Sequence, residues 1–389
     1  MLIRTLSLIA FLALPRLAPA QDACLQSIAS PGSDRGLHGQ VVLSTVVAGQ
    51  TNTRVVAGTA TGARLKGDEG FRIASITKSY VAATIFRLAE DGRIELDAPI
   101  TRWLPAPWLR ILEGDGYAPG EITVRHLLSH ASGLADHAQT PQFLQAILRE
   151  PQAEWTRARD VARLAEWTAP VGRPGEKFAY SDTGYVLLGE IVEQATGRDL
   201  PDAVSEQLGF ETLGLQRTWW ERYEMPNGRV RAHQLYQGID TYDWNPSMDL
   251  YGGGGLVASP ADVARFFDAL LDRRVFRKPA TLEWMTSSDG IPAGSAYRYG
   301  VFVYDERSAG STGHSGFWGT LVMREPKSRR TIAGAVTDGR DYPKAKAWME
   351  DYVRTVASPD SACASRREAA SSSLPVREGR GMTGDRSRA

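Results

Sequence analysis

The order of strand and helix patterns along the chain constrains the fold more than any other feature of the sequence. β-branched residues fill 39–47 and 53–57, and the polar segment between them predicts a hairpin. Strand patterns return only near the other end, at 300–304, 318–324 and 331–336. Helical patterns fill the region between. We therefore expect an α+β protein whose antiparallel sheet is built from both chain ends, is flanked by helices and carries an inserted, mostly helical region.

The expected helices are identified by apolar residues that recur every three or four positions. In 76–91 this spacing ends at Gly92, which can stop a helix. The segment 261–271 also carries start signals, because Ser259 can cap it and Pro260 suits the first turn. Further helices are expected at 123–130, 142–149, 158–167 and 184–195, with a closing helix at 342–356.

The two ends of the chain differ in composition from the body. Residues 1–20 combine Arg4, an apolar run and Ala18-Pro19-Ala20, the pattern of a cleaved secretory signal. The apolar run is too short to span a bilayer, so we expect a periplasmic or secreted protein without a membrane span. Residues 357–389 are rich in Ser, Ala and Arg and predict a disordered tail. The body, 21–356, is expected to be one unit, with the sheet from 21–74 and 291–356 and the helical region from 75–290.

Charge and cysteine content exclude several classes of protein. The chain has 45 Lys and Arg against 45 Asp and Glu, and this balance argues against nucleic-acid binding. Cys24 and Cys363 are too few for a disulfide-rich scaffold or a cysteine zinc module. In an oxidising compartment the two could pair, and spacing alone does not decide between a bridge and two free thiols.

The first of three motifs with chemical potential is Ser75-Ile76-Thr77-Lys78. Residues three positions apart lie on one face of a helix, so Ser75 and Lys78 are expected to be neighbours. A serine hydroxyl becomes a nucleophile when a base takes its proton, and an amine can be that base if its pKa is lowered. The helix N-terminus adds a positive potential that favours an alkoxide and an uncharged lysine.

The second and third motifs supply a proton carrier and an oxyanion site. In Tyr180-Ser181-Asp182, a tyrosine whose pKa is lowered by a neighbouring ammonium can move a proton between nucleophile and leaving group. In Gly313-His314-Ser315-Gly316-Phe317, small residues would let a substrate approach a strand edge, and the Phe317 N–H could face an oxyanion. Trp318, which follows, is a candidate cleft wall.

In this order, the three motifs resemble those of the penicillin-recognising serine hydrolases, the family of class C β-lactamases, serine D,D-carboxypeptidases, D-aminopeptidases and related esterases. Framework segments at 96–100, 122–134, 185–189 and 253–257 extend the resemblance over most of 39–356. The resemblance implies a β-lactamase/transpeptidase-like fold. It also implies an exported serine hydrolase, without metal or organic cofactor, that acts on a small ester, amide or D-amino-acid peptide. Peptidoglycan is a further candidate partner.

The resemblance also implies a role for each site residue. Ser75 would attack a carbonyl and form an acyl-enzyme, while Lys78 and Tyr180 handle the proton. The N–H groups of Ser75 and Phe317 would stabilise the oxyanion. His314 would be the fourth catalytic residue and line the third side of the site. The remaining candidates bind the substrate: Asp182, Ser315, Gly316 and Trp318.

Two positions depart from the family pattern. Asp182 stands where asparagine is usual, and an ionised carboxylate cannot donate the hydrogen bond that an amide gives to a substrate carbonyl. His314 stands where β-lactamases carry lysine. Because histidine is largely neutral near pH 7, this position favours a carboxypeptidase, D-aminopeptidase or esterase over an efficient β-lactamase.

Alternatives remain at this stage. A shifted register would make Ser181 the proton carrier. The spacing of His126, His130 and Asp136 is similar to a zinc-protease motif, although Leu127 stands where the general base should be. A class C-like β-lactamase, or a catalytically weak homologue that binds peptidoglycan or a partner, would also fit the family resemblance.

Overall fold

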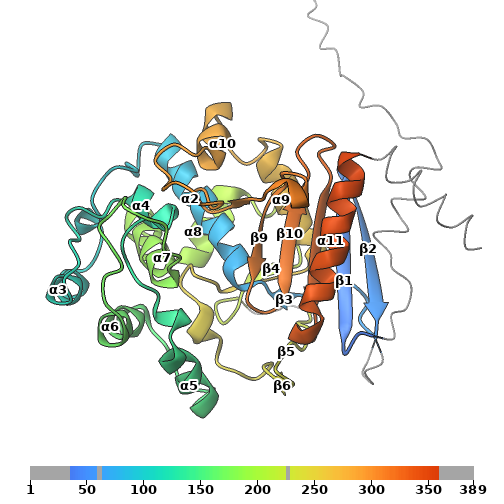
Figure 1. Cartoon of the computed structure of the whole chain (residues 1–389), viewed down its shortest axis with the longest axis horizontal. Helices are drawn as coiled ribbons and strands as arrows, with labels where there is room; N and C mark the ends of the chain where they lie inside the picture. Colours follow the sequence, from blue (N-terminus) through green and yellow to red (C-terminus); the bar gives the residue numbers. More distant parts are fainter. Residues whose placement is uncertain (1–35, 59–63, 225–227, 359–389) are drawn as a thin grey trace, which may run out of the picture.

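The main sheet brings together the two ends of the body. The computed structural model describes residues 36–58, 64–224 and 228–358. Its largest sheet is antiparallel, with strand order β2-β1-β11-β10-β9-β8 (Figure 1). β1 (Gln40–Val47) pairs with β2 (Gln50–Ala57) on one side and with β11 (Thr331–Val336) on the other. The sheet continues through β10 (Thr320–Arg324), β9 (Thr312–Gly316) and β8 (Phe302–Val303). The predicted α+β fold is confirmed.

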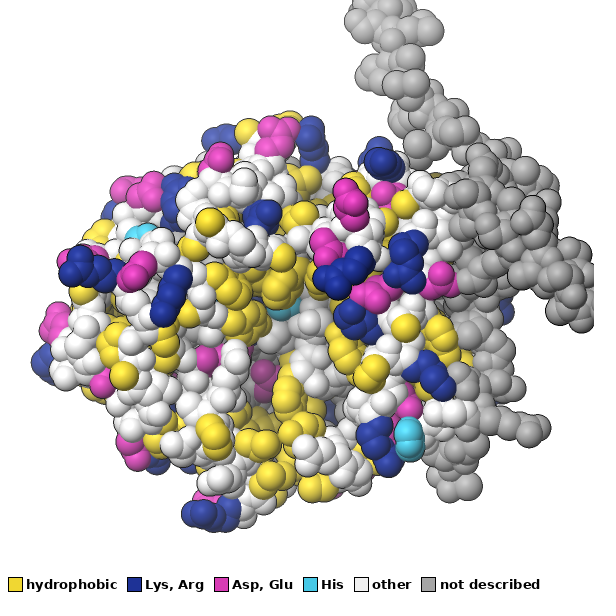
Figure 2. Space-filling view, viewed as in Figure 1, with side chains coloured by type: hydrophobic (Ala, Val, Ile, Leu, Met, Phe, Trp, Pro, Cys, Tyr) yellow, Lys and Arg dark blue, Asp and Glu magenta, His cyan; other side chains and the backbone are white. Residues whose placement is uncertain are grey.

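Each face of this sheet packs against helices, as the two-residue period of a strand requires. Leu321 and Met323 of β10 face α11 (Tyr342–Ala357). Val322, between them, faces the opposite side and joins the larger core. There α9 (Pro260–Leu271) crosses β1, β11 and β10. Figure 2 shows that the molecular surface is hollowed between the sheet and the helical region, with hydrophobic side chains around the hollow.

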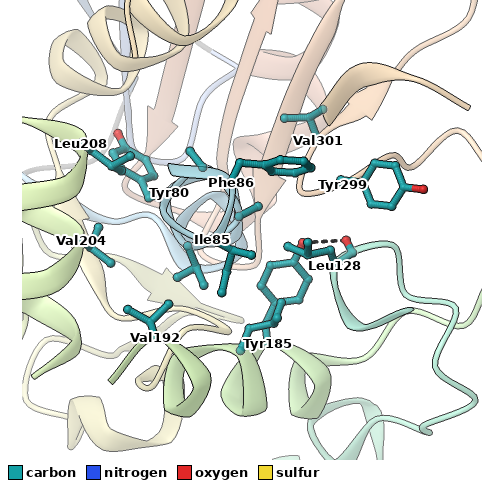
Figure 3. Close-up of a cluster of buried hydrophobic side chains, with 14 of the residues drawn as sticks. Tyr80, Ile85, Phe86, Leu128, Tyr185, Val192, Val204, Leu208, Tyr299 and Val301 are labelled. Carbon is teal, nitrogen blue, oxygen red and sulfur yellow. Dashed lines mark hydrogen bonds between the residues drawn. The ribbon is translucent and has the colours of Figure 1, made fainter. Parts of the chain in front are cut away.

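The helical region is built around α2 (Thr77–Glu90). Side chains on all sides of α2 are buried from Thr77 to Leu88, as expected for a helix at the centre of a core. α7 (Asp182–Thr196) and α8 (Leu200–Leu208) pack against it. Figure 3 shows Ile85 and Tyr80 of α2 pointing toward apolar side chains of these two helices. The N-terminus of α2 is therefore fixed in position where it meets the sheet.

The remaining elements complete the framework. The helical region also contains α3 (Ala106–Gly114), α4 (Val124–Leu128), α5 (Pro141–Arg149), α6 (Arg157–Trp167) and α10 (Pro279–Thr286). A small sheet has the order β3-β7-β4, from Phe71–Arg72, Leu256–Ala258 and Thr218–Trp220, and β5 (Leu235–Tyr236) pairs with β6 (Ile239–Asp240). Among the described residues, none of the helices is long and apolar enough to cross a membrane.

Several boundaries differ from those expected. α3, α8 and α10 were not predicted from the sequence. The third motif is itself the strand β9, and β10 starts only at Thr320 because Gly319 N–H donates to the Gly316 carbonyl and closes a turn. α7 starts at Asp182, since Ser181 is its N-cap. The expected signal at 1–20, both cysteines and the tail from 359 onward lie outside the described residues.

Candidate active site

Ser75 lies in a short 3₁₀ turn, η1 (Ala74–Ile76), which leads into α2. Ala74, immediately before it, has φ of 44°, in the left-handed region that a non-glycine residue seldom adopts. Such a conformation costs about 1 kcal/mol or more and persists only where the surroundings enforce it. Ser75 is partly exposed, whereas both of its neighbours are buried. The turn therefore presents one hydroxyl at the surface of an otherwise buried segment.

Lys78 Nζ is the centre of the site. It lies 3.0 Å from Ser75 Oγ and 2.6 Å from the Gly253 carbonyl oxygen, and it also contacts Asp182 Oδ1. Its side chain is fully buried. An ammonium has three N–H donors, and these three acceptors satisfy all of them. A neutral amine would fit the same three partners. It could donate to the Gly253 carbonyl oxygen and to Asp182 Oδ1, which only accept, and it could accept a hydrogen bond from the Ser75 hydroxyl.

Tyr180 lies on the other side of Ser75. Its hydroxyl lies close enough to the side chains of Ser75 and Lys78 for both to lower its pKa, and Lys78 Nζ is 5.1 Å from the centre of its ring. Burial raises the pKa of Tyr180 to about 12, although the Lys78 charge opposes this. The Lys78 ammonium lowers this pKa as expected, but burial and the Asp182 charge outweigh it, so the expectation of a lowered pKa is wrong. Near pH 7 the phenol is protonated and acts as a hydrogen-bond donor.

The charge on Lys78 is controlled by Asp182. Burial by itself lowers the pKa of Lys78, but the Asp182 carboxylate, with a smaller contribution from Tyr180, outweighs burial and raises it above the ordinary value. The sequence-based expectation of a lysine made neutral by burial is therefore reversed. Asp182 keeps 23% of its side-chain surface exposed, so the side chain is also accessible to solvent.

The alternative that makes Ser181 the proton carrier does not fit its surroundings. Ser181 is buried, and its hydroxyl donates to the Ala135 carbonyl at 2.6 Å. The same oxygen accepts from Gly184 N–H and caps α7. Both functions of the hydroxyl are structural, and Tyr180 is the member of the second motif that reaches Ser75.

β9 forms the opposite wall. A Cβ atom on Gly316 would lie 2.1 Å from the Ile73 carbonyl oxygen, so only glycine allows β9 to approach the segment before Ser75 this closely. Ser315 and Gly316 are partly exposed, and Phe317 is 62% exposed at the turn that follows. The three motifs that were expected to form one site thus meet at the hollow.

His314 does not supply a charge to the site. Burial lowers its pKa to about 3, and Lys78 lowers it further, so the imidazole is neutral near pH 7. Its Nδ1 bonds the Ser315 carbonyl at 2.8 Å and must be protonated to do so, which leaves Nε2 as an acceptor. Nε2 is buried without a hydrogen-bond partner among the described residues. His314 therefore lies behind the surface of β9 and carries no fixed cation.

Aromatic side chains surround the rest of the hollow. Trp318 is nearly buried, packs edge-on against Trp244, and donates from Nε1 to Asp249 at 3.0 Å. Phe317 packs against Trp318 and against Tyr236 of β5. This cluster also contacts Ala74, next to Ser75. An acyl group bound to Ser75 would meet an apolar, aromatic surface on this side.

The residues with zinc-protease spacing have other structural partners. His126 completes a capping box at the start of α4, and Asp136 accepts from Ala138 N–H. His130 Nδ1 accepts from Ser181 N–H, and its ring lies 4.1 Å from that of Tyr180. In the part of the chain that the structure describes, no three metal-ligating side chains are grouped to hold an ion. His130 instead supports the segment that carries Tyr180.

Two groups near the site were not predicted from the sequence. The Gly253 carbonyl accepts a hydrogen bond from Lys78, but a backbone acceptor cannot be recognised from the residue type. The glycine run at 252–255 was the one feature of this segment that stood out in the sequence. Asp249 lies behind Trp318 and is partly buried, and burial raises its pKa to about 7. A carboxyl after Pro246 in a polar loop gave no sign of this burial.

Comparisons with known proteins agree with this geometry. The model of the family described as Beta-lactamase matches residues 29–352. The chain belongs to this family. Such a match, together with esterase and penicillin-binding relatives, confirms that the protein is a penicillin-recognising serine hydrolase by descent and fold.

Three relatives illustrate the range of the β-lactamase family around this chain. Esterase EstB of Burkholderia gladioli is 30% identical over 299 residues, covering 66% of this chain and 74% of the esterase. Penicillin-binding protein 4* of Bacillus subtilis is 26% identical over 294 residues, covering 69% of this chain and 60% of that protein. The structure of a D-stereospecific amidohydrolase from Streptomyces sp. has a TM-score of 0.66 and 26% identity, covering 85% of this chain and 98% of the other.

Proposed function

We propose that this protein hydrolyses esters or amides through an acyl-enzyme on Ser75. The observation that carries this proposal is the meeting of Ser75 Oγ, Lys78 Nζ and the Tyr180 hydroxyl at the edge of one hollow. In this mechanism Lys78 takes the Ser75 proton during attack, and Tyr180 passes it to the leaving group. The backbone N–H groups of Ser75 and Phe317 stabilise the oxyanion. Water then attacks the acyl-enzyme and regenerates Ser75.

The substrate class follows from the charges around the hollow. His314 is neutral, and Arg72, behind Trp318, uses its guanidinium on Glu221 and on backbone carbonyls. Neither side chain offers a free cation to a substrate carboxylate. We therefore favour uncharged substrates with an apolar acyl group, and this places an esterase ahead of a D,D-carboxypeptidase or a β-lactamase.

A D-amino-acid amidase is the second candidate. It is supported by the partly exposed Asp182 carboxylate, which could accept hydrogen bonds from a substrate ammonium, and by the similarity to a D-stereospecific amidohydrolase. In either case we expect the mature protein to act outside the cytoplasm after removal of residues 1–20. Peptidoglycan fragments are among the peptide substrates to test.

Covalent labelling tests the proposal directly. A fluorophosphonate should add one adduct to the wild-type protein, found by intact mass and mapped to Ser75, and Ser75→Ala should not be labelled. The same variant should lose turnover by roughly 10,000-fold while its circular dichroism spectrum is unchanged. A panel of p-nitrophenyl esters, D-phenylalanine amide, a D-Ala-D-Ala peptide and a chromogenic cephalosporin then separates the candidates. Normal turnover by Ser75→Ala would refute the proposal.

A further inference from the structure

Asp182 gives this site a feature that an asparagine there could not: a second group able to hold a proton in direct contact with Lys78. The Lys78 and Asp182 side chains form an ion pair, and the lysine partner is completely buried. As an ammonium, Lys78 has no lone pair for the Ser75 proton. If Ser75 is the nucleophile, as proposed above, Lys78 must release a proton before it can receive one. That proton must go either to solvent or to Asp182.

We propose that Asp182 is the terminal acceptor in a proton relay, so that the Ser75 proton moves to Lys78 while Lys78 passes a proton to Asp182. At the start the relay is Ser75 hydroxyl, Lys78 ammonium and Asp182 carboxylate. As Ser75 Oγ bonds to the substrate carbonyl carbon, the carbonyl π electrons move to its oxygen, and the relay becomes Lys78 ammonium and protonated Asp182. When the tetrahedral intermediate collapses, Lys78 protonates the leaving group through Tyr180 and recovers its proton from Asp182.

The contacts of Lys78 fit both states of the relay. The Gly253 carbonyl and Asp182 Oδ1 can only accept from Nζ while Asp182 is ionised, and Ser75 Oγ can accept or donate. When Nζ passes a proton to Asp182, it is left with one lone pair that points toward Asp182. Rotation about the Cε–Nζ bond turns this lone pair toward Ser75 Oγ, where it takes the Ser75 proton and makes Nζ an ammonium again. No heavy atom needs to move by more than a hydrogen-bond adjustment. Asp182 acts through Lys78 and does not touch the reacting atoms.

The titratable groups that face this pair are histidines, tyrosines and carboxyls whose pKa values are shifted by burial. Burial lowers the pKa of His130, His137 and His314, so all three are neutral near pH 7. Burial raises the pKa of the other neighbours, which are Tyr180, Tyr185, Tyr297 and Asp160, and brings those of Asp136 and Asp249 to about 7. The histidines and tyrosines therefore add no charge beside the pair near pH 7, whereas Asp136 and Asp249 are about half ionised there. None of these neighbours is a cation that would compete with Lys78 for Asp182. The low polarity of such a site also reduces the advantage of the ion pair over the neutral pair.

The wild-type pH profile is the first test. With an internal relay, kcat/KM for a p-nitrophenyl ester is expected to be flat from about pH 6 to pH 9, because solvent need not remove a proton from Lys78. Without it, kcat/KM should rise about tenfold per pH unit across this range, because the fraction of neutral Lys78 rises tenfold per unit. That rise in the wild-type enzyme would overturn the proposal without any variant.

The second test is Asp182→Asn, which keeps the shape and removes the second proton acceptor. We expect kcat to fall roughly 100-fold at pH 7, with KM little changed, and to recover about tenfold per pH unit above that. Asp182→Glu should restore part of the loss and the flat profile. The matched control is Asp202→Asn, which replaces an exposed carboxyl in the first turn of α8. It should leave kcat and the pH profile unchanged.

The second test can also refute the relay. If Asp182→Asn is as active as the wild type at pH 7, or more active with a profile moved to lower pH, Asp182 only holds a proton on Lys78 and the relay is wrong. Fluorophosphonate labelling of Ser75 at pH 9 separates this result from failure of the proposed function, which would leave Ser75 unlabelled in every variant.

Discussion

Asp249 illustrates how burial sets the charge of single residues in this protein. Its side chain is partly buried and accepts a hydrogen bond from Trp318 Nε1. Burial, followed by the Asp182 charge, raises its pKa from the ordinary 3.8 to about 7. Between these two values the folded protein binds a proton that the unfolded chain has released. The stability that Asp249 contributes is therefore complete at low pH and is lost as the pH rises from about 4 through 7.

Asp249→Asn should remove this pH dependence. The amide oxygen can still accept from Trp318, and no charge has to be buried at high pH. Relative to the wild type, the free energy of unfolding of the variant is expected to increase between pH 5 and pH 8 by about 2 to 3 kcal/mol. Urea denaturation at the two pH values measures this difference in unfolding free energy. Glu113→Gln, at an exposed side chain, is the control. An equal difference at both pH values would contradict the assignment.

The identity of the site residues was easier to predict than their charge. Ser75, Lys78 and Tyr180 meet because each belongs to a short motif whose spacing fixes local geometry. The protonation states of Tyr180 and His314 depend on how many other segments cover them, and no local pattern contains that information. The contact of Lys78 with the Gly253 carbonyl could not be predicted from the sequence either, because every residue has a carbonyl group.

At the scale of elements, the site depends on how closely β9 approaches η1. Gly316 and Gly313 both lie where a side chain would collide with backbone: with the Ile73 carbonyl oxygen at 2.1 Å and with that of Val322 at 1.9 Å. The small residues of the third motif were interpreted as room for a substrate. The structure shows a second reason why these residues must be small: the neighbouring backbone lies where a side chain would be.

Gly316→Ala should therefore damage activity more than stability. The added methyl must push β9 away from Ile73, which moves the Phe317 N–H relative to Ser75, and a misplacement near 1 Å can cost about 100-fold in rate. We expect that loss in kcat/KM together with about 1 to 3 kcal/mol of destabilisation. Gly120→Ala is the control, because a Cβ there meets no atom within 4 Å. A variant with normal kcat/KM would show that the approach of β9 is not needed.

Element prediction succeeded where start signals were clear and failed for the shortest strands. The predicted helix at 261–271 matches α9, whose Ser259 cap and Pro260 were visible in the sequence. The strands β3, β4 and β7 are two or three residues long, too short to show a period, and they form only because a partner strand lies beside each. Their pairing depends on segments far apart in the chain.

At the scale of the whole molecule, the first and last described strands lie in the same sheet as one wall of the site. β1 pairs with β11, and β9, which carries the third motif, belongs to the same sheet. α11 covers the face of this sheet that points away from the helical region (Figure 1). The sequence predicted this closure from strands at both ends, but it did not show which helix would cover which face. We expect the sheet and the helical region to unfold together, since α9 and α2 belong to the core that both share.

Met349→Ala tests that cooperativity. Met349 is fully buried between α11 and the sheet, and a Cβ on Gly334 would lie only 2.8 Å from its sulfur, so the side chain sits directly on β11. Truncation leaves a cavity and should cost about 2 to 5 kcal/mol. We expect a single calorimetric transition at lower temperature, with kcat unchanged at 25 °C because Met349 lies on the face of the sheet opposite the larger core. Val230→Ala, at a side chain 61% exposed, should change stability by less than about 0.5 kcal/mol. Two separate transitions in the variant would show instead that the sheet and the helical region fold independently.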